Sequence, residues 1–130
     1  MSRMTSSTIP RSNDIQVIDR IHVDSIRTIV ERIANRFVPE KIILFGSQAY
    51  GKPDQSSDLD LLVILETPNG ELETALMISD SLPPHAFRID IIAKSREAIE
   101  DRISLGDPFI REVMSRGKTL YSGVLYDAQA

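Results

Sequence analysis

The sequence predicts a single domain of the α/β or α+β class, in which a small mixed sheet is flanked by helices. The chain has 130 residues, of which 42% are hydrophobic and 26% are charged, a size and balance typical of one compact domain. Short apolar runs of strand length alternate with segments whose apolar residues recur at helical spacing. Turn and capping residues separate these segments, and no internal repeat is present in the sequence.

The overall charge and composition exclude several classes of protein. Fifteen Lys and Arg residues against nineteen Asp and Glu residues give a net charge of -4, which argues against a general nucleic-acid-binding protein. The absence of cysteine excludes disulfide scaffolds, cysteine-ligated metal sites and thiol nucleophiles. No apolar run approaches the roughly 18 residues of a membrane span, and no secretory signal is recognisable. We therefore expect a cytoplasmic protein that does not associate with membranes.

The domain is predicted to span residues 14–122, between a flexible N-terminal tail over 1–13 and a C-terminal tail over 123–130. Its first helix is predicted to run from Asp24, which is placed to cap it, to Phe37, and Pro39 is expected to stop it. The apolar residues at helical spacing in this segment are Ile26, Ile29, Val30, Ile33 and Phe37.

Three strands and a second helix are predicted in the middle of the chain. Residues 41–45 form a short apolar run that ends at Gly46, and residues 58–65 form a second run that ends at a turn over 67–70. A helix marked by Leu72, Ala75, Leu76 and Leu82 follows and is terminated by a pair of prolines at 83–84. The third strand is predicted over 87–93.

The last part of the chain is predicted to contain two helices and an edge strand. Ser95 is expected to cap a helix over 96–103. Asp107 and Pro108 are typical of an N-cap and a first helical residue, and Gly117 is expected to close that helix. Residues 119–121 are predicted to add a short edge strand. The apolar face of the last helix is predicted to consist of Phe109, Ile110, Val113 and Met114.

Asp58 and Asp60 stand two residues apart at the start of the second strand. Because side chains alternate along a strand, both carboxylates are expected to point to the same face. An isolated Asp-x-Asp pair is most often only a solvated strand end. Here the strand continues as an apolar run over 61–65, so the two carboxylates are expected where a buried sheet meets a cleft.

Asp90 is a third candidate, because it lies among apolar residues in the third strand. A bare carboxylate is costly in a buried strand, and three carboxylates near one point would repel one another unless a cation neutralised them. Oxygen ligands of this kind favour Mg²⁺ or Mn²⁺ over zinc. The alternative is that Asp90 forms an ion pair with Arg88, two residues earlier on the same strand face.

Gly46 and Ser47 directly follow the first strand, where backbone N–H groups and a hydroxyl could bind an anion such as phosphate. The alternative is an ordinary turn. The stretch from Gly46 to Lys52 also approaches the pattern of a P-loop, but Pro53 replaces the hydroxyl residue that such a loop needs, and too few residues follow for its helix. Lys52 is therefore either an additional phosphate ligand or a solvated lysine.

Taken together, Leu44-Phe45-Gly46-Ser47, ten intervening residues, Asp58-Leu59-Asp60-Leu61 and later Asp90 resemble the minimal nucleotidyltransferases of the polymerase-beta-type superfamily. The resemblance covers most of the chain, from about His22 to Tyr121. It implies the polymerase-beta-type nucleotidyltransferase fold and a Mg²⁺-dependent transfer of a nucleoside monophosphate, AMP from ATP, to a hydroxyl group.

The resemblance also implies a role for each motif residue. Gly46 and Ser47 would bind the triphosphate, and Asp58 and Asp60 would hold two Mg²⁺ ions. Asp90 would complete the second metal site and assist deprotonation of the acceptor. One ion would activate the attacking oxygen and the other would stabilise the leaving pyrophosphate. This chain departs from many relatives at positions 48 and 50, where Gln and Tyr replace basic residues near the nucleotide.

Larger relatives carry a further domain for the acceptor, whereas this chain has nine residues after Tyr121, so we expect a partner to supply the acceptor. Small members of the family pair with HEPN-domain toxins as antitoxins, and some imply AMP transfer onto a tyrosine of the toxin. One alternative is a non-catalytic antitoxin that masks its partner by contact alone. Another is transfer to a small molecule such as an aminoglycoside, with a dimer completing the site. The oligomeric state, homo- or hetero-oligomeric, stays open.

Overall fold

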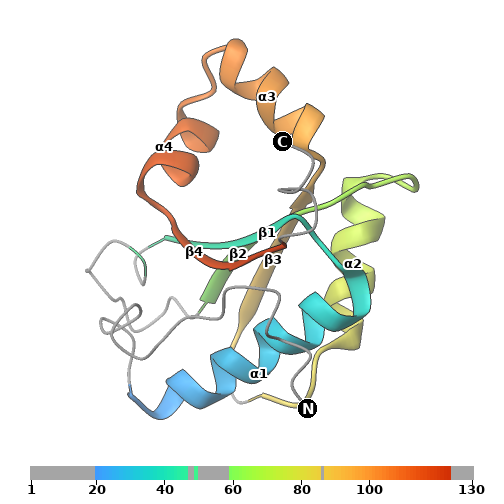
Figure 1. Ribbon diagram of the computed structural model, residues 1–130, viewed down its shortest axis with the longest axis vertical. Helices are drawn as coiled ribbons and strands as arrows, with labels where there is room; N and C mark the ends of the chain where they lie inside the picture. The colour runs from blue at the N-terminus through green and yellow to red at the C-terminus, as the bar shows by residue number, and fades with distance from the viewer. Residues whose placement is uncertain (1–19, 47–48, 50–58, 86, 124–130) are drawn as a thin grey trace.

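The computed structural model describes residues 20–46, 49, 59–85 and 87–123. Within these residues every predicted helix and strand is present, although several bounds differ (Figure 1). The elements in chain order are α1 (Arg20–Phe37), β1 (Lys41–Phe45), β2 (Leu59–Ile64), α2 (Glu71–Ser81), β3 (Ile89–Lys94), α3 (Arg96–Ser104), α4 (Pro108–Arg116) and β4 (Lys118–Ser122). Both predicted tails lie outside the described residues, except for Gly123, whose N–H donates to the carbonyl of Glu40.

The four strands form one mixed sheet in the order β3-β2-β1-β4. β1 pairs antiparallel with both of its neighbours, whereas β2 and β3 are parallel and are connected through α2. The helices α1 and α2 cover one face of the sheet, and α3 and α4 cover the other (Figure 1). The structure thus confirms the predicted small mixed sheet with flanking helices, and it places β3 and β4 at the edges.

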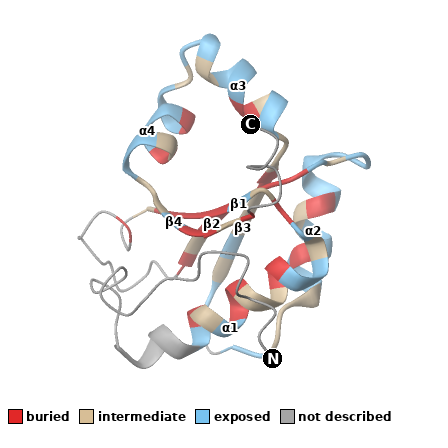
Figure 2. Cartoon of the chain, viewed as in Figure 1, coloured by how far each residue is buried: buried red, intermediate tan, exposed pale blue. Residues whose placement is uncertain are grey.

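Two apolar clusters hold the layers together (Figure 2). Side chains along β2 alternate between them, so that Leu61 faces α1 and α2, and Leu62 faces α3 and α4. The strand is buried on both faces, as its continuous apolar run predicts. The first cluster includes Ile26, Ile29, Val30, Ile33, Leu44, Leu61, Val63 and Ile78, and the second includes Ile43, Phe45, Leu62, Ile64, Ile99, Ile110 and Val113.

The helix ends confirm two of the predicted caps and correct a third. The hydroxyl of Ser95 accepts from the N–H of Ala98, and the carboxylate of Asp107 accepts from the N–H groups at 109 and 110. The first helix begins at Arg20, so Asp24 lies inside it and does not cap it. Gly117 does close α4, but with an ordinary φ of -65°. A glycine is needed there for space, since a Cβ would lie 2.5 Å from Ile43 Cγ2.

The burial of two helices also differs from the prediction. In α2 the buried residues are Thr74 and Ile78, while Leu72 and Leu76 are exposed. In α4 the buried residues are Ile110 and Val113, whereas Phe109 is 46% exposed. Apolar spacing therefore located both helices and identified Ile110 and Val113 as core residues, but it also assigned to the buried faces Leu72, Leu76 and Phe109, which are exposed.

Candidate active site at one end of the sheet

The strand directions bring three of the predicted site residues to the same end of the sheet. β1 ends where β2 begins, because the two strands are antiparallel, and β3 begins beside β2, because those two are parallel. Phe45, Asp60 and Asp90 therefore form one row of register partners across three strands. Gly46 follows Phe45 directly at the end of this row. The three predicted residues Gly46, Asp60 and Asp90 thus come from three separate elements.

Asp60 and Asp90 share one face of the sheet. Paired residues of neighbouring strands point to the same side, and residues two apart on a strand do so as well. Asp60 therefore faces the same side as Leu62, which packs under α3 and α4. The Asp60 side chain is partly buried and that of Asp90 is 57% exposed, so this carboxylate pair is open to solvent on its β3 side.

The expectation of a buried carboxylate at position 90 is wrong. β3 is an edge strand, and only Ala93 is buried along it. The predicted alternative, an ion pair with Arg88, is present as a contact of 3.9 Å between Nε and Oδ2, with the Arg88 side chain 64% exposed. Exposed pairs of this kind are worth at most about 1 kcal/mol, so the guanidinium does not prevent the carboxylate from binding a cation.

Gly46 lies directly against the carboxylate of Asp60. Its φ is +83°, a conformation that side chains other than glycine rarely adopt. A Cβ added at Gly46 would lie 3.2 Å from Cγ of Asp60 and would overlap its Oδ2. The glycine therefore permits both the turn after β1 and the close approach of backbone and carboxylate. The predicted residues Ser47, Lys52 and Asp58 lie outside the described residues.

The chemistry of the two described carboxylates fits a magnesium site. Two negatively charged groups on adjacent strands and one face repel each other, and a divalent cation relieves that repulsion. Carboxylate oxygens are the ligands that Mg²⁺ prefers. No group of three His, Asp or Glu side chains that could hold a metal occurs within 20–46, 49, 59–85 and 87–123, a set that excludes Asp58. Asp60 and Asp90 would hold the metal on the face of the sheet that α3 and α4 cover.

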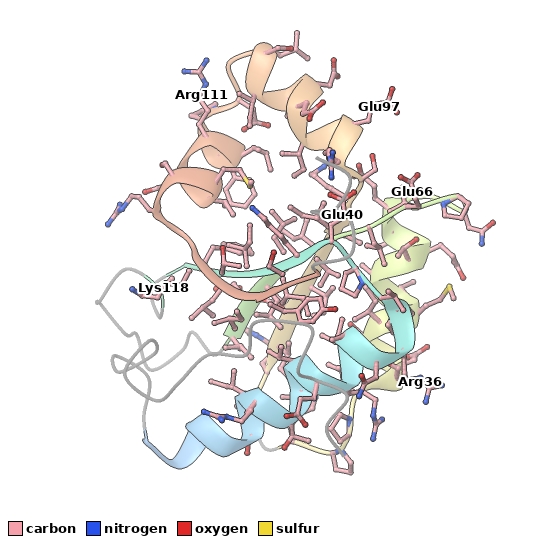
Figure 3. All side chains as sticks on the ribbon, in the orientation of Figure 1. Arg36, Glu40, Glu66, Glu97, Arg111 and Lys118 are labelled. Carbon is pink, nitrogen blue, oxygen red and sulfur yellow. The ribbon has the colours of Figure 1, made fainter. Side chains whose placement is uncertain are left out.

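Two residues near this end of the sheet were not predicted as functional. Lys118 begins β4 in register with Leu44, and its side chain points out from the same end of the sheet (Figure 3). Phe109 of α4 contacts Phe45, the register partner of Asp60. The sequence signal for Lys118 was weak, because a basic residue after a helix is common. Phe109 belongs to a helical pattern of apolar residues, and that pattern predicts a residue of the apolar face.

Comparisons with known proteins identify the family of this chain. Residues 23–120 match the family described as nucleotidyltransferase domain. The chain is also similar to the crystal structure of a candidate nucleotidyltransferase from Sulfolobus solfataricus, with 25% sequence identity and a TM-score of 0.46 over 65% of this chain and 82% of that chain. No curated protein matches the chain significantly. No helix within the described residues is long and apolar enough to cross a membrane. Because the family match covers most of the chain and includes the paired carboxylates of Asp60 and Asp90 (the carboxylate row), this chain belongs to the nucleotidyltransferase domain family, of the polymerase-beta type.

Proposed function

We propose that this nucleotidyltransferase transfers AMP from ATP to a hydroxyl group of a partner protein, and that the partner is a HEPN-domain toxin which the transfer inactivates. The single observation that carries the catalytic part is the register pairing of Asp60 with Asp90 on one face, beside the backbone of Gly46. Membership of the nucleotidyltransferase domain family supports the reaction class. The antitoxin role and the HEPN partner rest on the resemblance to minimal nucleotidyltransferases.

The proposed step is a substitution at the α-phosphorus of ATP. The acceptor oxygen would form a bond to that phosphorus, the bond from the phosphorus to the bridging oxygen would break, and pyrophosphate would leave with the electron pair. In this step Asp90 would accept the hydroxyl proton, and Asp60 would hold metal and orient the phosphates. Bound Mg²⁺ would neutralise the developing negative charge. Gly46 allows the phosphates to approach the backbone closely.

The open edge of the site supports a macromolecular acceptor. Asp90 lies on the edge strand β3 with its side chain 57% exposed, so a large partner can reach it. Two cavities of about 400 Å³ lie elsewhere in the structure. One is lined by residues of α3, α4 and the opposite ends of the strands, and the other lies between α1 and α2. Neither of these two cavities is lined by Asp60 or Asp90.

The experiment takes the protein encoded by the neighbouring gene, which the proposal requires to be a HEPN-domain protein, combines it with this protein in the presence of ATP and Mg²⁺, and follows both by intact-mass spectrometry. The partner should gain one or more AMP units, and peptide mapping should place them on a tyrosine, serine or threonine. Asp60→Asn should abolish the gain, whereas Asp80→Asn, a change to an exposed carboxylate on α2, should not. Without the partner the protein should be almost inert, because half of the site is then missing.

Three other outcomes would redirect the proposal. Neutralisation of the toxin without any mass change, and equally well by the Asp60→Asn variant, would show a masking protein. AMP transfer to an aminoglycoside in place of the partner would show a small-molecule enzyme. No transfer and no neutralisation with the adjacent HEPN protein would overturn the proposed partner.

A further inference from the structure

We infer that Phe109 forms a stacking site for the nucleotide base, that is, a binding site for a flat aromatic heterocycle beside the carboxylate row. The inference rests on the proposed function, because it assigns a position to the part of ATP that the carboxylates and Gly46 leave without a contact. It adds a residue that the sequence pattern had placed in the core.

The position of the Phe109 ring relative to the carboxylates is the first argument. Its centroid lies 5.5 Å from that of Phe45, and the two ring planes are inclined by 81°. Phe45 is 8% exposed and is the register partner of Asp60. The Phe109 ring therefore lies one buried side chain away from the carboxylate row, on the face of the sheet that Asp60 shares with the apolar cluster under α4.

The exposure of this ring is the second argument. Phe109 is 46% exposed although it adjoins Ile110, which is 1% exposed in the core. An edge-to-face contact with Phe45 uses only part of the ring surface and leaves the remainder in water. Aromatic side chains exposed next to a binding site are the usual platforms on which nucleic-acid bases stack. Burial of this surface by a base would be favourable.

The backbone under the ring is held in place before any ligand binds. The Asp107 carboxylate accepts from the N–H of Phe109 at 2.9 Å and from the N–H of Ile110 at 3.2 Å. Ile110 anchors the same turn in the core. A platform that is already ordered loses little entropy when a base stacks on it.

The charge at the N-terminus of α4 favours the base, and not the phosphates, as the part of ATP that binds beside Phe109. The N-terminus of a helix usually attracts phosphate. In α4 the Asp107 carboxylate already occupies the N–H groups and also pairs with Arg102 at 3.0 Å. A second anion would be repelled by that carboxylate, whereas an uncharged base would not. The phosphates are expected instead at Gly46 and the metal, so the two ends of ATP are assigned to two different surfaces.

The chain contains no tryptophan, which allows a direct test. In the Phe109→Trp variant the new indole is the sole tryptophan, and stacking of a base should quench its fluorescence. We expect ATP with Mg²⁺ to quench it and inorganic triphosphate with Mg²⁺ to leave it unchanged. Leu105→Trp, which places the indole on an exposed position at the end of α3, should respond to neither compound.

Calorimetry supplies the matching affinity measurement. Phe109→Ala should weaken binding of a non-hydrolysable ATP analogue by about fivefold or more, the effect expected from losing one base–aromatic contact. It should leave the affinity for inorganic triphosphate unchanged. Phe109→Tyr, which keeps an aromatic ring, should retain the ATP affinity, and circular dichroism should show that all variants are folded.

The results separate this inference from the proposed function. If the wild-type protein binds the ATP analogue but Phe109→Ala binds it equally well, or if triphosphate quenches Phe109→Trp as strongly as ATP, the stacking site is wrong and the nucleotide site stands. If the wild-type protein binds neither ATP nor triphosphate, the proposed function itself is wrong.

Discussion

Gly46 and Asp60 contact each other across β1 and β2 so closely that residue 46 has no room for a side chain. A Cβ on Gly46 would lie 3.2 Å from the Asp60 carboxyl carbon and closer still to Oδ2. The same glycine has a φ of +83°. Because residue 46 has no side chain, the backbone can make the turn after β1 and the Asp60 carboxylate can lie against it.

Gly46→Ala should cost more stability than the backbone strain alone. Gly106 is the matched control, because its φ is +82° and nothing lies within 4 Å of a Cβ built there. Gly106→Ala should lower the free energy of unfolding by about 1 kcal/mol through strain. Gly46→Ala should lower it further. We expect Mg²⁺ to raise the melting temperature of the wild type, and Gly46→Ala should abolish that rise. Equal losses in the two variants, measured by urea denaturation, would show that Asp60 has room to move aside.

Asp60→Asn and Asp90→Asn should each reduce AMP transfer at least about a thousandfold, which corresponds to roughly 4 kcal/mol of barrier. The fold should survive, since one side chain is partly buried and the other is exposed. Without Mg²⁺ each variant removes the like-charge repulsion between the two carboxylates, and Asp90→Asn also removes the exposed pair with Arg88, so neither variant should change the free energy of unfolding by more than about 1 kcal/mol. Thermal denaturation with and without Mg²⁺ tests this, with Asp80→Asn as control. If either variant retained near-normal transfer, the carboxylate that it replaces would not be catalytic.

The stability of α4 should depend on pH through Asp107. Hydrogen bonds from the N–H of Ile110 and from Arg102 lower the pKa of this carboxyl below its usual value of 3.8, and the N–H of Phe109 lowers it further. Because the folded-state pKa is the lower one, the stabilisation is present above pH 3.8 and is lost as the pH falls through the folded-state pKa.

Asp107→Asn should reduce this dependence, since an amide can still cap the helix but cannot ionise. Urea denaturation from pH 7 down to pH 3 measures the difference between the variant and the wild type. Ser95→Ala serves as the control, because it removes a cap of α3 that does not titrate. If the variant lost stability between pH 4 and pH 3 as steeply as the wild type, Asp107 would not be the titrating group.

Val38→Gly should stabilise the protein by about 0.5–1 kcal/mol. Val38 follows α1 with a φ of +47°, where a β-branched side chain is strained, and it is 64% exposed, so little packing is lost on its removal. The strain relieved should exceed the entropy that glycine adds to the unfolded chain. Leu105→Gly, at a right-handed C-cap that is 67% exposed, should not stabilise. The melting temperatures of the two variants test this prediction. A loss of stability in Val38→Gly would show that the backbone of Val38 is not strained.

Local chemistry in the sequence was sufficient to identify the elements and the N-caps of α3 and α4, although it did not locate the start of α1. The side-chain oxygens of Ser95 and Asp107 accept hydrogen bonds from the first N–H groups of the helices that follow them, and this interaction spans only three residues. The run of apolar residues in β2 likewise predicts a strand buried on both faces. Such signals are readable from the sequence because the groups involved are neighbours along the chain.

What only the tertiary structure decided was the pairing and the exposure of these elements. The sequence named Asp60 and Asp90 as candidates, but the parallel pairing of β2 with β3 is what makes them adjacent on one face. It also left β3 at the sheet edge, which exposes Asp90, and it placed Phe109 beside Phe45 with its ring partly in water. Strand order and helix packing depend on contacts between residues far apart in the chain, and the periodicity of a single segment carries no information about its neighbours.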